Sequence, residues 1–356
     1  MTRPARVIVD VAAVVENFKV VQARSPNARI MAIVKADGYG HGIVRVAKAL
    51  DDCTDSFGVA SLEEAIKLRE AGIARPIVLL EGPFEAAELR DIVAHRLECV
   101  VHSEHQLAWI AEAAEKLNVW IKVDSGMHRL GFAPSQIPKV VESLQTGSHS
   151  FRFMTHLASA HHANDRSVDE QLAVFHCAVD AYNSEASIAN SSAVLSWPTV
   201  QAKWVRPGLM LYGVSPFETS VGSDHGLQSA MTVASQLIAV REVASGSGVG
   251  YGRGYICPTQ MRVGVVAFGY GDGYPRNAST GTPIVVAGIR TQVIGQASMD
   301  MLTVDLRPIP DAAVGDPVVL WGRELPVEEI ARHAETIPYE LLCRVRMRAR
   351  YVERRT

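Results

Sequence analysis

The most informative absences in this sequence concern paired cysteines, an excess of charge and long apolar runs. The five cysteines are scattered and form no C-x-x-C pair, which argues against a disulfide framework or a metal site and favours a reducing, cytoplasmic environment. The 35 Lys and Arg residues nearly balance the 38 Asp and Glu residues, which argues against nucleic acid or an anionic membrane as a partner. No uncharged run approaches the ~20 residues that cross a bilayer. Asp10 and Glu16 interrupt the apolar N-terminal stretch and no small-residue cleavage site follows. We therefore expect this stretch to belong to the mature protein and not to a signal peptide.

A further absence narrows the fold class, because no G-x-G-x-x-G follows the first predicted strand, as a dinucleotide-binding sheet requires. Instead, short apolar runs alternate with helical patterns over the first ~230 residues, as buried parallel strands and their crossover helices do. The predicted strands are Ile30–Val34, Phe57–Ala60, Ile77–Leu80, Cys99–Val101, Val119–Val123, Phe151–Met154, Ala186–Ala189 and Trp204–Val205. Eight such units predict an α/β fold, a TIM-like (β/α)8 barrel over residues 11–230.

Local signals place two helices within this barrel and a different architecture after it. A helix is predicted over Val11–Ala23 with Asp10 as its cap, and another begins at Ser61, where Ser61 and Glu64 fit a capping box. Beyond residue 231, strands with Gly-rich turns predict a mainly β domain formed by residues 1–10 plus 231–356. Its predicted strands are Arg262–Val266, Pro283–Val286, Thr291–Gly295, Leu302–Leu306 and Pro317–Leu320, and the alternation in Arg344–Tyr351 favours a half-exposed strand over a basic recognition segment.

Polar residues follow the predicted strands at the end of a barrel where catalytic groups gather. Lys35 directly follows the first strand, and partial desolvation of its amine suits it to a Schiff base with an aldehyde, although a snorkelling lysine at the rim is equally compatible. Later strands end in the segments 122–129, 155–156, 190–192 and 206–208. Together these predict a site for an anion, in which Gly208 and the small Ser191 let backbone N–H groups approach a phosphate.

Five segments carry a family resemblance: Val34–Gly42, Lys122–Gly131, Val249–Gly252, Gly269–Arg276 and Ser298–Asp300. In order and spacing they resemble the signature motifs of alanine racemases, and the chain length resembles that of the compact catabolic type. The departures are Asp37-Gly38 in place of Asn-Ala, Gly271 in place of Ala, and Ser298 where some relatives have Cys. The resemblance implies pyridoxal phosphate held covalently by Lys35, which also acts as one base, and Tyr251 as the base on the opposite face of alanine. It further implies a homodimer with composite sites, because Tyr251 of the family reaches the barrel of the other subunit.

The resemblance also assigns roles to the remaining site residues. Arg206 would face the cofactor's ring nitrogen and, since an arginine only donates, would leave that nitrogen unprotonated; a structural salt bridge is the alternative for Arg206. His156 would lie between Tyr251 and Arg206, and the side chain of Lys122 would be carbamylated as in many relatives, or remain a plain lysine. The resemblance implies that the cofactor phosphate is held by Tyr39, Ser191, Gly208, Leu209 and Tyr339, and that Asn190 lies near the cofactor. Arg129 and the Met299 N–H would bind the substrate carboxylate. Tyr270, Met299 and Tyr339 would form a tight pocket around the methyl group.

Three other functions fit parts of this pattern. A decarboxylase of the same barrel-plus-β class would pair the ring nitrogen with a carboxylate, which Arg206 argues against. A non-catalytic pyridoxal-phosphate-binding protein would have the barrel alone. A broad-specificity racemase differs only in how large a side chain it admits, and the sequence leaves this open, together with the choice between D-alanine supply and alanine catabolism.

Overall fold

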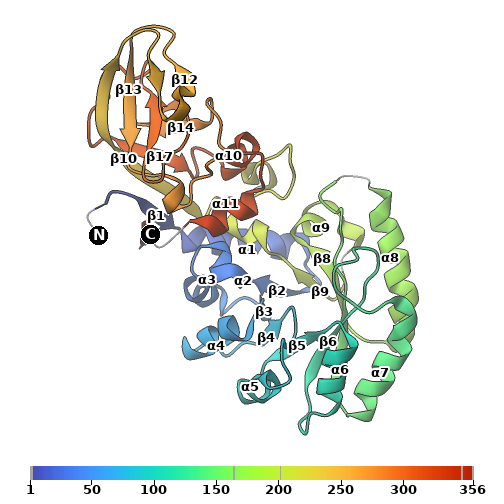
Figure 1. Cartoon of the computed structure of the whole chain (residues 1–356). Helices are drawn as coiled ribbons and strands as arrows, with labels where there is room; N and C mark the ends of the chain where they lie inside the picture. The colour runs from blue at the N-terminus through green and yellow to red at the C-terminus, as the bar shows by residue number, and fades with distance from the viewer. Residues whose placement is uncertain (1–2, 163–164, 201, 346–347, 355–356) are drawn as a thin grey trace. The chain divides into compact units, whose positions relative to one another are not determined.

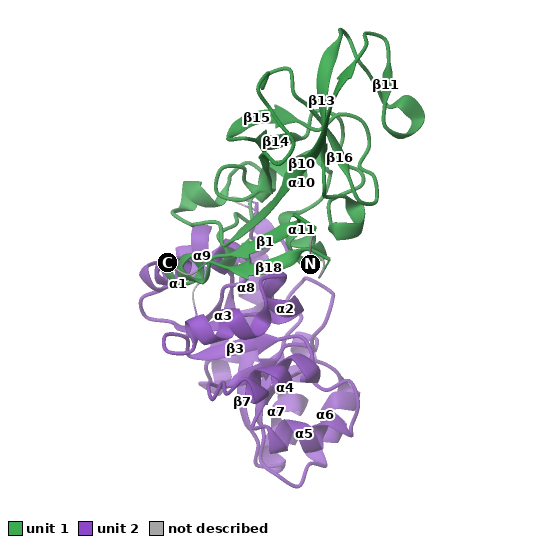
Figure 2. Cartoon of the chain, turned by 90° about the vertical axis from the view of Figure 1, so that its left-hand side faces the viewer, with its two compact units in different colours: residues 1–16, 212–356 green, residues 17–211 purple. Residues whose placement is uncertain are grey.

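The chain forms two compact units in the computed structural model, which describes residues 3–162, 165–200, 202–345 and 348–354. One unit comprises residues 17–211, and the other combines residues 1–16 with 212–356 (Figure 2). Within the described ranges, no helix has the length and apolar character needed to cross a membrane.

The unit of residues 17–211 is a closed barrel of parallel strands, which confirms the predicted (β/α)8 architecture. The strands follow one another in chain order, and the last pairs with the first through the register Arg29–Trp204 and Ile30–Val205. They are β2 (Arg29–Ile33), β3 (Ser56–Val59), β4 (Ile77–Leu79), β5 (Glu98–Val101), β6 (Asn118–Lys122), β7 (Ser150–Met154), β8 (Ala186–Asn190) and β9 (Trp204–Arg206). The observed strands coincide with the predicted ones to within one or two residues, because a strand that is buried on both faces must be an apolar run.

Helices surround this ring of strands, and Figure 1 shows α5, α6 and α7 on its outside. The helices are α1 (Val11–Arg24), α2 (Lys35–Tyr39), α3 (Ile43–Leu50), α4 (Leu62–Glu70), α5 (Glu88–Ala94), α6 (Glu104–Ala111), α7 (Ile137–Thr146), α8 (Arg166–Val179) and α9 (Ser191–Ser196). Asp10 caps α1 as predicted, since its carboxylate accepts the Ala13 N–H at 3.1 Å. The predicted capping box of α4 is wrong: the Ser61 side chain makes no cap hydrogen bond, and Glu64 accepts the N–H groups of Ala60 and Ala36 instead.

A polar cluster closes the barrel near the amino-terminal ends of its strands, opposite the predicted site residues. The Arg152 guanidinium lies 5.3 Å from the Trp120 ring and 5.7 Å from the Trp204 ring. It pairs with the carboxylates of Glu98 at 3.3 Å and Glu185 at 3.2 Å. Each carboxylate also accepts one indole N–H at 2.7 Å. Because every charge in the cluster has a partner, it joins β5, β6, β7 and β9 without an uncompensated buried group.

The second unit is mainly β, as predicted, and is organised around one long strand, β10 (Met231–Val243). β10 pairs with β1 (Arg6–Val9), β13 (Met261–Val266) and β17 (Pro317–Trp321). The other elements are β14 (Pro283–Val286), β15 (Ile289–Gln292), β16 (Leu302–Asp305), β18 (Arg350–Glu353), the hairpin of β11 (Gly248–Val249) and β12 (Tyr255–Ile256), and the helices α10 (Val327–His333) and α11 (Pro338–Arg344).

Three expectations for this unit need correction. The sequence analysis missed β10, although its first seven residues alternate between buried and half-buried. The strand predicted over Thr291–Gly295 ends at Gln292, and Gly295 takes a positive φ of 71°. The strand predicted over Arg344–Tyr351 is wrong at its start: Arg344 ends α11, a helix that begins with a proline in its first turn and buries Leu341 and Leu342. β18 begins only at Arg350, while residues 346–347 lie outside the described ranges.

Candidate active site

A left-handed turn follows β2 after two intervening residues and begins immediately after Lys35. The four residues after Lys35 have φ values between 51° and 63°. This conformation costs roughly 1–2 kcal/mol for each residue that is not glycine, so the surrounding contacts must stabilise it. Asp37 accepts the Ile43 N–H at 3.0 Å, and Nδ1 of the buried His41 lies 3.0 Å from the Gly38 oxygen and 2.9 Å from the Tyr39 oxygen. Burial lowers the pKa of His41 to about 4, so the ring is neutral with its proton on Nδ1.

The Tyr39 hydroxyl lies against the backbone that follows β9. A Cβ atom added to Gly208 would lie 2.6 Å from this hydroxyl, so only glycine fits. The Ser191 hydroxyl oxygen accepts hydrogen bonds from the N–H groups of Gly208 at 2.9 Å and Met210 at 3.3 Å. Leu209, which stands between these two residues in the sequence, is buried. The structure therefore brings together Tyr39, Ser191, Gly208 and Leu209, while the Asn190 side chain caps α9 by accepting the Ala193 N–H at 3.1 Å.

Arg206 ends β9 and is buried. It donates to the Ser187 hydroxyl at 2.7 Å and to the Thr155 carbonyl at 2.6 Å, and it lies 3.4 Å from Nδ1 of His156. These partners of Arg206 are a hydroxyl, a carbonyl and an imidazole, and none is a carboxylate. Burial lowers the pKa of Arg206 to about 10, so it stays charged at neutral pH.

His156 is neutral for two physical reasons. Burial and the neighbouring Arg206 hold its pKa well below the usual value, and three further cations act in the same direction. Since Nδ1 faces the Arg206 donor, it must act as the acceptor, which places the ring proton on Nε2. His156 can therefore donate one hydrogen bond from Nε2 without carrying a charge.

Lys122 ends β6 and is buried close to other cations. Burial first, and then Arg206, Arg129 and Lys35, lower the pKa of Lys122 to about 8, against the opposing effect of Glu81. Arg129 is exposed on the following loop, which Asp124 shapes by accepting the N–H groups at positions 126 and 128. Lys122, Arg129 and His156 line one small cavity. The mouth of the barrel thus concentrates positive charge, which suits an anionic ligand.

The other four candidate residues belong to the mainly β unit. Tyr251 begins a short 3-10 turn between β11 and β12, and its side chain is 72% exposed. The Tyr270 N–H donates to the Ser298 oxygen at 3.0 Å, and the N–H of the next residue donates to the Met299 oxygen at 2.8 Å, so these two segments lie side by side. Met299 is 53% exposed. Tyr339 is the second residue of α11.

Sequence reasoning missed three residues that support this site. Ser187 holds Arg206, and its signal was a polar residue within an otherwise apolar strand. Gln171 on α8 accepts the Ala158 N–H at 2.9 Å and donates to the His156 oxygen at 3.2 Å, which orders the loop after β7. No pattern in the sequence predicts the contacts of Gln171. Glu64 did give a signal, but the capping-box interpretation assigned it the wrong partner.

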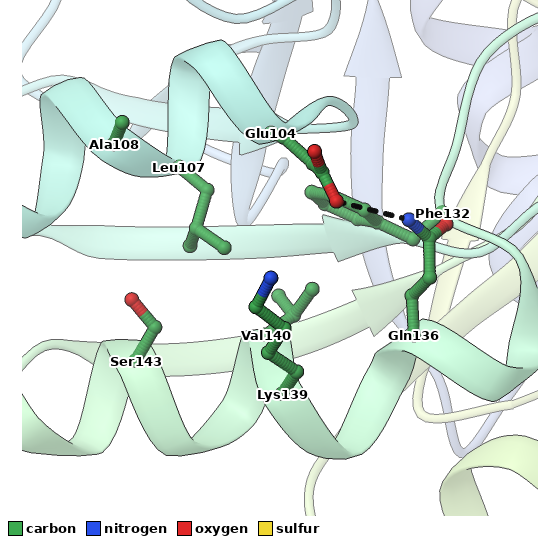
Figure 3. A pocket seen from close by; sticks show the side chains of 8 residues that line it. All are labelled: Glu104, Leu107, Ala108, Phe132, Gln136, Lys139, Val140 and Ser143. Atoms are coloured by element: carbon green, nitrogen blue, oxygen red, sulfur yellow. Dashed lines mark hydrogen bonds between the residues drawn. The ribbon is translucent and has the colours of Figure 1, made fainter.

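A groove between α6 and α7 lies away from these residues. Figure 3 shows its eight lining side chains, with a hydrogen bond of 3.4 Å between Gln136 and Glu104. Glu104 and Lys139 are its only charged lining residues, and none of the candidate site residues lines it. The groove therefore contributes nothing to the chemistry proposed for the barrel mouth.

Comparison with known proteins gives a consistent result. The family model "Alanine racemase, N-terminal domain" matches residues 9–216, and "Alanine racemase, C-terminal domain" matches residues 230–353. The chain is 47% identical to an alanine racemase of Pseudomonas entomophila over 348 residues, and 47% identical to a catabolic alanine racemase of Pseudomonas putida over 352 residues, in each case over 97% of both chains. The crystal structure of a biosynthetic alanine racemase from Pseudomonas aeruginosa superposes with a TM-score of 0.97 at 42% identity, over 99% of this chain and 100% of that one.

Proposed function

Because the chain belongs to the alanine racemase family, we propose that it interconverts L- and D-alanine, with Lys35 and Tyr251 as its two bases and pyridoxal phosphate as its cofactor. The observation that carries this assignment is the barrel mouth, where Lys35 and three further cations lie close enough to lower the pKa of His156, and where the Tyr39 hydroxyl lies against Gly208. These residues fit an anionic phosphate ester, since cations attract it and the missing Cβ of Gly208 lets the Tyr39 hydroxyl lie close to the backbone N–H groups there.

When bound, pyridoxal phosphate accepts the electrons that remain on the α-carbon of alanine after its proton is removed. Lys35 would hold this group by its amine, and Tyr39, Ser191, Gly208, Leu209 and Tyr339 would hold the phosphate. Arg206 can only donate hydrogen bonds, so it would leave the ring nitrogen unprotonated. A weaker electron sink favours return of the proton to the α-carbon over transamination or decarboxylation.

Racemisation requires proton transfer on both faces of the α-carbon, and one residue serves each face in this proposal. The Lys35 amine would remove or return the proton on one face, and the Tyr251 phenol on the other. A phenol of ordinary pKa is a weak base, so its anion needs a hydrogen-bond donor. The Nε2–H of the neutral His156, which Arg206 holds through Nδ1, supplies a donor of this kind.

Substrate recognition is assigned to residues of both units. The exposed Arg129 guanidinium and the Met299 N–H would bind the alanine carboxylate, while Tyr270, Met299 and Tyr339 would limit the side chain to a methyl group. Carbamylation of Lys122 would place an anion beside Arg129: the amine nitrogen bonds to the carbon of CO2 and loses a proton. Only a neutral amine reacts in this way, and the lowered pKa of Lys122 supports the modification.

We infer a homodimer in which Tyr251 completes the site of the other subunit. The 72% exposure of this tyrosine in the single chain is consistent with that role. We also infer a cytoplasmic location, because the five cysteines are free thiols.

Three measurements test the proposed function. Borohydride treatment of the holoenzyme should label Lys35, and chiral chromatography of a panel of L-amino acids should show D-alanine as the main product, without release of CO2. Tyr251→Phe should reduce turnover by at least ~100-fold while the visible absorbance of the cofactor remains, and Tyr255→Phe in the same hairpin serves as the control. Labelling of another residue, or a Tyr251→Phe variant with the parent rate, would refute the assignment.

A further inference from the structure

The carboxylate of Glu64 joins the ends of two neighbouring barrel strands. Its Oε1 accepts at 2.7 Å the N–H of Ala36, which directly follows Lys35 and lies three residues after the end of β2. Its Oε2 accepts the Ala60 N–H at 2.9 Å, directly after β3. A carboxylate has an acceptor on each oxygen and no donor, so both contacts use the chemistry that only an ionised acid offers.

The Ala36 amide is a sensitive place for such a contact. Its N–H belongs to the peptide that links Lys35 to Ala36, so the hydrogen bond fixes the orientation of that peptide and thereby the direction in which the Lys35 side chain leaves the backbone. Ala36 also opens the left-handed turn, with φ 54° and ψ 50°, a conformation that alanine rarely adopts. A second residue of the same face of α4, Lys67, contacts the turn through Asp37 at 3.1 Å.

We propose that Glu64 is a positioning residue for Lys35: it holds the Lys35–Ala36 peptide in its strained orientation so that the amine points into the barrel mouth. This inference rests on the proposed function of Lys35. Glu64 touches neither substrate nor cofactor in this role. It acts through the backbone, and misplacing a reacting amine by a fraction of an ångström slows proton transfer more than it weakens substrate binding.

The discriminating variant is Glu64→Gln, because glutamine keeps the size of the side chain but offers only one acceptor oxygen. Its NH2 group would then face a backbone N–H, so at least one of the two contacts is lost. Glu63→Gln is the matched control, since it removes the same charge from the adjacent, exposed position of α4. Both variants are compared with the parent in thermal unfolding to confirm that they fold.

Two readouts report the proposed role directly. In cofactor-free protein, hydrogen exchange of peptides covering residues 34–42 should be about tenfold faster in Glu64→Gln and unchanged in Glu63→Gln. In the holoenzyme, Glu64→Gln should lower kcat about tenfold, change KM for alanine less than about threefold, and alter the visible circular dichroism of the bound cofactor. The Ala36 amide of the parent must itself exchange slowly, which can be measured even if the variant does not fold.

The outcomes separate this inference from the proposed function. If the parent racemises alanine and Glu64→Gln matches it in exchange, kcat and circular dichroism, the inference is overturned and the proposed function stands. A fall in kcat that is accompanied by an equal fall in cofactor occupancy, with unchanged exchange of residues 34–42, would also overturn it. If the parent does not racemise alanine, the proposed function fails, and the exchange data alone decide whether Glu64 holds the turn.

Discussion

Replacement of Lys122 by methionine should stabilise the cofactor-free protein when CO2 is excluded. Lys122 is buried beside Arg206, and Arg129 and Lys35 add further positive charge. These surroundings disfavour the protonated amine in the folded state, whereas in the unfolded chain the same amine is solvated. Methionine has a similar unbranched shape and no charge, so Lys122→Met removes the repulsion without leaving a large cavity.

The expected gain follows from the pKa. A pKa lowered from its ordinary value of 10.5 to about 8 corresponds to about 3 kcal/mol of lost stability at neutral pH. Because the unfolded state binds the proton more tightly, this penalty is fully present below pH 8. It decreases as the pH rises from 8 and disappears above 10.5. The free energy of unfolding of Lys122→Met should therefore exceed that of the parent by about 3 kcal/mol near pH 7 and by roughly half of that near pH 9.5.

Urea unfolding in buffers purged of CO2 measures this difference, and Lys48→Met, at an exposed position of α3, controls for the added apolar side chain. Addition of bicarbonate should then stabilise the parent but not Lys122→Met, because carbamylation converts the repelled cation into an anion. Equal stability of parent and Lys122→Met near pH 7, or a difference that grows with pH, would refute the reasoning.

Three further predictions concern single contacts. Gly208→Ala should weaken cofactor binding at least ~10-fold in an equilibrium titration, because the new Cβ meets the Tyr39 hydroxyl; added to Tyr39→Phe, which lacks that hydroxyl, the same change should weaken binding less, and an equal effect in both backgrounds would contradict the steric explanation. Arg152→Met should lower the free energy of unfolding by about 2 kcal/mol in urea without changing KM, since Glu98 loses its cation and Glu185 keeps only Arg29 at 3.8 Å, at the opposite ends of the strands from the site; an altered KM would argue against that separation. Ser187→Ala should cost about 2 kcal/mol of stability and lower kcat, since the buried Arg206 loses an acceptor, and an unaffected unfolding curve would show the bond to be dispensable.

The barrel was predictable because its strands are short and most of their residues are buried on both faces. Such a strand must be an apolar run, and a chain of alternating strands and helices closes into few architectures. β10 escaped prediction because it is half-buried over much of its length and changes partners along the way, from β1 and β17 to β13. The alternation of buried and half-buried residues stops after Leu237, and the buried face before it includes Ser235, so the apolar pattern is short and interrupted.

Strand periodicity and motif spacing are enough to place Lys35, Lys122, His156 and Arg206 at or just after the ends of barrel strands. The protonation states of these residues, in contrast, depend on the fold. The lowered pKa of Lys122 and the neutral ring of His156 arise from burial and from cations that belong to other strands and loops. Likewise, Glu64 accepts a hydrogen bond from the turn after β2 rather than from the first turn of its own helix, because the free energy of a hydrogen bond depends on distance in space and not on separation along the chain.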